Sequence, residues 1–118
     1  MKGKILGTLL FLASFGAYAG DAIVTWDPPT QYEDNTTILP GEIQNYKVYY
    51  GQSDGGPYGF VVTVPGTVTT TTVTGLAKGT WYFVATAITT NGLESAYSNQ
   101  SAKSVQGSSK PRPPRNVR

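Results

Sequence analysis

The 118-residue sequence contains no cysteine and no histidine. Without cysteine the protein has no disulfide, no thiol nucleophile and no thiolate metal ligand. Without histidine it also lacks the commonest general base and the commonest metal ligand. No local pattern of serine, lysine or carboxylate residues takes their place. The sequence therefore predicts a protein that is not an enzyme, has no catalytic or metal-binding residues and needs no cofactor.

The sequence also has no hydrophobic run long enough to cross a membrane, which takes about 20 apolar residues. The longest largely apolar stretch, residues 5–12, follows Lys2 and Lys4 and precedes small residues that end at Ala19. This arrangement is typical of a cleavable secretion signal. We therefore expect a signal peptide at residues 1–19 and no transmembrane span after its cleavage. The product would be secreted, periplasmic or extracellular, and the compact signal indicates a bacterial or phage type.

Charged residues are few and unevenly distributed. Residues 20–102 carry two lysines against seven carboxylates, a net charge of −5, whereas residues 103–118 carry five basic residues and no acidic ones. We expect a single domain over 20–105 and a basic Pro/Arg-rich tail over 106–118. Such a tail is either solvated or attracted to an acidic surface, including the body of another copy. The acidic body disfavours nucleic acid as a partner.

Short runs rich in Val, Thr, Tyr and Ile alternate with Gly, Pro, Asn and Asp from residue 22 onward. This pattern predicts an all-β protein without helices. The prolines Pro28 and Pro29 end the first strand, because proline cannot donate to a ladder. A long loop follows over 30–42. The predicted strands cover residues 22–26, 46–50, 58–64, 67–74, 80–89 and 95–105.

Five motifs occur in an informative order. They are Trp26 with Pro28-Pro29, residues 46–51, Leu76 before Gly79-Thr80, Ala87-Ile88 before Asn91-Gly92, and residues 94–99. In this order, residues 23–105 resemble a fibronectin type III domain. The resemblance implies an immunoglobulin-like sandwich of about six to seven strands, in which the predicted strands correspond to B, C, C′, E, F and G. The implied core consists of Trp26, Tyr46, Val48, Leu76, Phe83 and Ala87.

The start of strand F departs from the family pattern. The family places there a tyrosine whose hydroxyl bonds the nearby chain. Alternation counted back from Ala87 puts Phe83 inward and Trp81 at this corner, whereas spacing from Leu76 favours Tyr82. A shift of one residue turns a whole strand over, so the sequence leaves the choice between these two residues open.

Strand A, which should pair with the first predicted strand, has no residues left once 1–19 are removed. An open strand edge promotes aggregation and is normally covered. Three remedies are open: a short stub from Gly20, a strand from another protein, or residues 111–118 of a neighbouring copy. The last would place the missing strand in trans and build a head-to-tail assembly.

The resemblance implies a secreted, non-enzymatic binding or structural module for protein–protein or surface contact on a cell or virion. One alternative is a self-assembling subunit whose tail donates the missing strand. Another is a carbohydrate-binding accessory module, for which exposed coplanar rings of Tyr49, Tyr58 and Tyr97 would be the support. Tyr32 is either a contact or packs its own loop. The candidate interaction residues are Tyr32, Glu33, Asp34, Asn91, Leu93, Arg112, Arg115 and Arg118.

Overall fold

The structure is a computed structural model that describes residues 11–18, 20–106 and 113–117. The described residues form seven strands: β1 (Phe11–Tyr18), β2 (Asp21–Asp27), β3 (Ile43–Gly51), β4 (Phe60–Pro65), β5 (Thr70–Val73), β6 (Gly79–Thr89) and β7 (Ser101–Val105). Within these ranges no helix is long and apolar enough to span a membrane. The predicted all-β class is confirmed.

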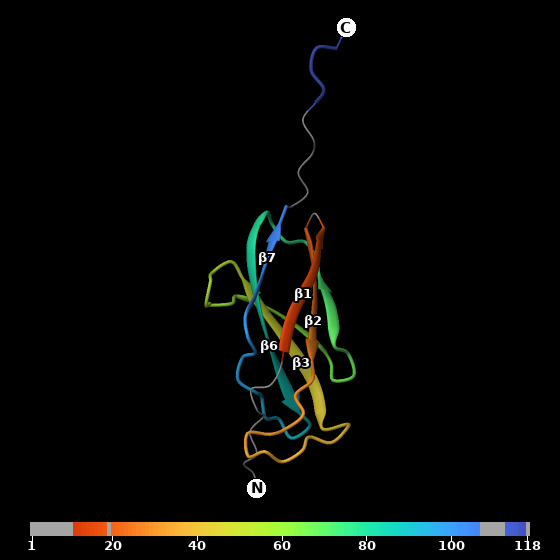
Figure 1. The fold of residues 1–118 in the computed structure, drawn as a ribbon, viewed down its shortest axis with the longest axis vertical. Helices are drawn as coiled ribbons and strands as arrows, with labels where there is room; N and C mark the ends of the chain where they lie inside the picture. Colours follow the sequence, from red (N-terminus) through yellow and green to blue (C-terminus); the bar gives the residue numbers. More distant parts are fainter. Residues whose placement is uncertain (1–10, 19, 107–112, 118) are drawn as a thin grey trace.

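The strands make two antiparallel sheets, β1-β2-β5 and β4-β3-β6-β7. Figure 1 shows the long strands running side by side along the molecule, with the loop between β3 and β4 projecting from its side. Side chains alternate between the two faces of each strand. In β2 every second residue is buried, and in β3 Tyr46 and Val48 are buried, as expected for strands packed between two sheets; this confirms the immunoglobulin-like sandwich.

The core lies between the two sheets. Trp26 of β2 packs on Tyr46 of β3 with ring centroids 5.3 Å apart. Apolar area removed from water contributes about 25 cal/mol per Å², so the burial of these large rings stabilises the fold. All six core residues expected from the sequence are buried: Trp26, Tyr46, Val48, Leu76, Phe83 and Ala87.

Strand A is present in the full chain, so the expectation that it is missing is wrong. Phe11–Tyr18 forms β1 and pairs antiparallel with β2, from Phe11 opposite Asp27 to Tyr18 opposite Asp21. The turn between the two strands uses Gly20 at φ +83°, a value that favours glycine. Pairing satisfies the backbone groups along an edge of β2 that would otherwise be open. A segment assigned to the signal peptide therefore occupies this position, while residues 1–10 and 19 lie outside the described residues.

The corner at the start of β6 is occupied by Trp81. Its side chain is 6% exposed, and its indole Nε1 donates a hydrogen bond to the carbonyl of Ala77 at 2.8 Å. Tyr82 is half-buried and lies on the other side of the strand. The alternation from Ala87 is thus the correct register, and an indole N–H makes the bond that the resemblance assigns to a phenolic hydroxyl.

Candidate functional site

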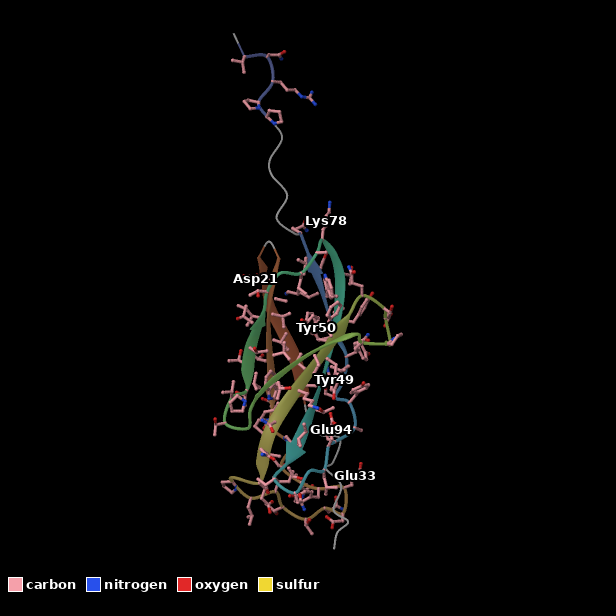
Figure 2. All side chains as sticks on the ribbon, turned by 180° about the vertical axis from the view of Figure 1, so that it is seen from behind. Asp21, Glu33, Tyr49, Tyr50, Lys78 and Glu94 are labelled. Atoms are coloured by element: carbon pink, nitrogen blue, oxygen red, sulfur yellow. The ribbon has the colours of Figure 1, made fainter. Side chains whose placement is uncertain are left out.

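Three tyrosines from separate segments meet on the outer face of the four-stranded sheet. Tyr49 points outward because Tyr46, Val48 and Tyr50 of the same strand belong to the core or pack against it. Tyr58 precedes β4, and Tyr97 precedes β7. Figure 2 labels Tyr49 and Glu94 close together on this side of the molecule. We call the surface formed by Tyr49, Tyr58, Tyr97, Thr86 and Glu94 the tyrosine face.

The tyrosine face contains a shallow depression of about 430 Å³. Tyr49 and Thr86 line it from the sheet, and residues 94–97 line it from the segment before β7. Val84, which lies opposite Tyr49 in the pairing of β3 with β6, is only 2% exposed. The tyrosines therefore cover part of the outer face and form a small second layer there.

Two serines hold the segment that carries Tyr97. The Ser95 hydroxyl accepts from the N–H of Ala87 at 3.0 Å, and the Ser98 hydroxyl accepts from the N–H of Ala85 at 2.9 Å. The backbone N–H groups of both serines return bonds to the same two alanines. These side-chain bonds replace a regular ladder, so β7 begins at Ser101 and not at Ser95 as predicted. Tyr97, between the serines, is 52% exposed.

The tyrosine rings meet edge to face. Tyr97 lies 5.3 Å from Tyr49 with an interplanar angle of 62°, and 5.5 Å from Tyr58 with an angle of 88°. Edge-to-face pairs are favourable because the positive ring edge meets the negative ring face. The three rings are therefore ordered against each other, but they do not form one flat platform.

Glu94 connects the rings to the sheet. Its Oε2 accepts from the Tyr49 hydroxyl at 2.6 Å and from the Thr86 hydroxyl at 2.7 Å. Burial alone would raise the pKa of Glu94, but these two bonds and the nearby charge of Lys47 outweigh it and hold the pKa below its ordinary value. Burial, followed by the bond to ionised Glu94, raises the pKa of Tyr49 to about 12. At neutral pH the site is therefore a carboxylate held by neutral hydroxyl groups.

Gln100 holds the other side of the tyrosine face. Its Oε1 accepts from the Tyr58 hydroxyl at 2.6 Å and from the backbone N–H of Gly55 at 2.8 Å. Its Nε2 donates to Asp54 at 2.8 Å. One amide thus ties the loop between β3 and β4 to the segment before β7, and places a second carboxylate beside the rings.

This arrangement is suited to binding. It offers exposed ring surface, two carboxylates and preorganised hydroxyl groups. Among the described residues no three His, Cys, Asp or Glu side chains group as metal ligands would. The pH behaviour of Tyr49 and Glu94 keeps both groups in one ionisation state near neutral pH, which fits recognition better than proton transfer.

The residues predicted for interaction lie on two loops and in the C-terminal tail. Tyr32 is 6% exposed and donates a hydrogen bond to Glu42 at 3.1 Å, so it packs its own loop. The other described candidates lie at loops or in the tail, with Leu93 half-buried and Glu33, Asp34, Asn91 and Arg115 exposed. Arg112 and Arg118 lie outside the described residues. The loop that carries Tyr32 and the turn that carries Asn91 lie at the same end of the sandwich, where the N–H of Thr90 donates to the carbonyl of Glu42 at 3.0 Å.

A second depression lies next to the predicted loop over 30–42. It measures about 270 Å³, and its lining includes Pro28, Pro29, Leu39 and Pro40. Leu39 is 58% exposed. This surface has few hydrogen-bonding side chains, so it offers less specificity than the tyrosine face.

Sequence reasoning found part of the tyrosine face and missed the rest. Tyr49, Tyr58 and Tyr97 were singled out as candidate sugar contacts, and residues 94–99 were recognised as a motif. The roles of Thr86 and Gln100 were missed. Polar residues are common on outer strand faces and in loops, so only proximity in the fold identifies these two.

Comparison with protein-family models matches residues 16–104 to the fibronectin type III domain model. The matched range includes the end of β1, in agreement with its place in the sandwich. The search against curated proteins returns no match.

Solved structures with the same fold come from diverse proteins. The sixth fibronectin type III domain of the human fibronectin type III domain containing protein 3 has a TM-score of 0.61 at 18% identity, with 97% of this chain and 96% of that one covered. A redesigned β-sandwich protein has a TM-score of 0.60 at 20% identity, covering 83% and 93%. A β-1,2-glucanase from Parabacteroides distasonis has a TM-score of 0.66 at 18% identity, where 91% of this chain corresponds to 13% of the enzyme.

Proposed function

Because the chain belongs to the fibronectin type III family, we propose that it is a secreted, non-enzymatic binding module that contacts a protein on a cell or virion surface through the tyrosine face. Domains of this family are binding or structural modules, which supports the general class. The specific contact is our proposal. Its main support is the exposure of Tyr97, 52%, on a ring cluster that is held in place by hydrogen bonds.

Ordered tyrosines favour a protein partner. A tyrosine offers large contact area at low conformational-entropy cost, and its hydroxyl adds directional bonding. The rings here are already held against each other and by Glu94 and Gln100. Binding therefore requires little further ordering, which is one of the main costs of association.

Carbohydrate binding is the second candidate. A sugar ring stacks best on a flat, exposed aromatic surface, and the angles of 62° and 88° give Tyr97 no coplanar neighbour in this cluster. One similar structure is a β-1,2-glucanase, but this chain corresponds to only 13% of it. The hydroxyl groups and carboxylates of the tyrosine face are the feature that favours this candidate.

Strand donation by the tail depends on processing. In the full chain β1 already occupies the edge of β2, so the tail of a neighbour has no vacant position there. The edge becomes vacant only if the chain is cut after Ala19 as a signal peptidase would cut it. Self-assembly by this route is therefore a proposal for the processed chain alone.

The test uses fluorescently labelled full-length protein and isolated bacterial envelopes, before and after treatment of the envelopes with proteinase. We expect saturable retention that proteinase treatment abolishes and that Tyr97→Ala weakens by about tenfold, the effect of losing ~1.4 kcal/mol of contact energy. Leu39→Ala is the matched control, because Leu39 is 58% exposed in the loop before β3, outside the tyrosine face. Retention that survives proteinase supports the carbohydrate candidate, and retention insensitive to Tyr97→Ala refutes the tyrosine face as the contact.

A further inference from the structure

The C-terminal segment Pro113–Val117 is exposed at every residue, and Val117 is 82% exposed. In Figure 2 it lies beyond the end of the sandwich where Lys78 is labelled. The segment joins two consecutive prolines to Arg115. Proline-rich segments favour the polyproline II helix, which has no internal hydrogen bonds and leaves its carbonyl groups free to bind a partner.

The tyrosine face has the features that recognise such a segment. Polyproline II segments dock in grooves lined by aromatic side chains. Tyr97 stands at 62° to Tyr49 and at 88° to Tyr58, so adjoining rings form angled walls and not a flat surface. Pyrrolidine rings fit between walls of this kind. The Tyr97 hydroxyl makes no hydrogen bond to the described residues, so it can donate to a carbonyl of the incoming segment.

Charge on the two surfaces is complementary. Both hydrogen bonds to Glu94 use Oε2, and the bond to Asp54 uses Oδ1. One oxygen of each carboxylate is thus left to accept from the guanidinium of Arg115. Lys47 is also close to Glu94 and opposes this attraction. Exposed ion pairs contribute about 0–1 kcal/mol each, so the carboxylates orient the segment and the rings supply most of the contact.

The C-terminal tail is barely long enough to reach the tyrosine face of its own copy. Val105, the last residue of β7, lies opposite Gly79, and Thr86 at the tyrosine face is seven residues further along β6. Seven strand residues span about 23 Å. The seven residues between Val105 and Pro113 can cover about 23–25 Å when fully extended. They would have to reverse direction and run taut, whereas a second copy imposes no such restriction.

We propose that the tyrosine face of one copy binds the Pro/Arg-rich C-terminal segment of a second copy. The inference rests on the proposed function in taking the tyrosine face as the binding surface. In this proposal the tail binds the tyrosine face and not the edge of β2, so β1 does not have to be removed. Each copy would offer one face and one tail. Such a head-to-tail contact is heterologous and builds open chains of copies.

The first measurement is the molar mass of the full chain by light scattering over a concentration series. We expect the mass to rise with concentration past that of a dimer. Tyr97→Ala removes the receiving ring, and the triple variant Pro113→Ala, Pro114→Ala, Arg115→Glu removes the incoming segment. Each should lower the association constant by at least about tenfold, while Leu39→Ala behaves as the unmodified protein. The altered side chains are exposed, and circular dichroism checks that each variant is folded.

A mixture of the two defective variants provides the decisive measurement. The Tyr97→Ala protein keeps an intact tail and the tail variant keeps an intact face, so a mixture should form one-to-one pairs and no longer chains. A monomeric full chain at every concentration overturns the proposal. The proposal is also overturned if the molar mass of the tail variant rises with concentration as much as that of the full chain. The absence of pairs in the mixture overturns it as well. Failure of the proposed function is separate, because it appears as envelope retention that Tyr97→Ala leaves unchanged.

Discussion

Ser98→Ala tests whether the serine bonds hold the tyrosine face in place. The Ser98 hydroxyl accepts from the N–H of Ala85 at 2.9 Å. Ala85 is fully buried and Ser98 is 9% exposed. Removing the hydroxyl leaves the N–H without this acceptor at a position where water has little access. The backbone bond from Ser98 to the Ala85 carbonyl is retained, so the segment is weakened and not released.

The expected cost follows from this geometry. Leaving a buried backbone donor unsatisfied costs about 1–3 kcal/mol. Because Ser98 retains slight exposure, we expect Ser98→Ala to lower the free energy of unfolding by about 2 kcal/mol. Small domains have total stabilities of about 5–15 kcal/mol, so the variant should still fold. The tyrosine rings should lose part of their fixed orientation, because Tyr97 is the neighbour of Ser98.

Urea unfolding followed by tryptophan fluorescence measures the loss, and near-ultraviolet circular dichroism reports the order of the tyrosines. Ser104→Ala is the matched control, since Ser104 is exposed in β7. The control should change stability by less than about 0.5 kcal/mol. If Ser98→Ala falls within the same range as the control, the serine bonds do not support the segment and the reasoning is refuted.

Three other outcomes are expected. Trp81→Phe removes the bond from Nε1 to the Ala77 carbonyl and should cost about 0.5–1.5 kcal/mol in urea unfolding; an unchanged midpoint would contradict its corner role. Deleting residues 1–19 removes β1 and opens the edge of β2, so light scattering should detect aggregation, which a synthetic peptide of residues 11–18 should suppress. Tyr49 should ionise at about 12 and not at 10, which phenolate absorbance measures against Tyr49→Phe. Since its folded pKa is raised, its contribution to stability is complete below pH 10 and is lost as the pH rises through about 12.

The local sequence pattern was sufficient to predict most strands of the sandwich. The resemblance to the fibronectin type III domain implied that Trp26, Tyr46 and Val48 belong to the core, and all three are buried. Strand ends were less predictable. The predicted last strand began at Ser95, but serine hydroxyl groups take over the ladder there, and β7 starts at Ser101. A side chain that substitutes for a backbone partner leaves the composition of the strand unchanged, so the pattern carries no sign of it.

The sequence by itself determined the fold class, the inward faces of the main strands and the separation of an acidic body from a basic tail, because these depend on residue type at short, regular spacing. Tertiary structure decided which residues fill positions that depend on distant partners. Apolar residues such as those of 11–18 suit a secretion signal and an edge strand equally well, and in the full chain they pair with the edge of β2. Tyr49, Tyr58 and Tyr97 become one surface only because β3 and β6 pair side by side and Gln100 joins the flanking segments.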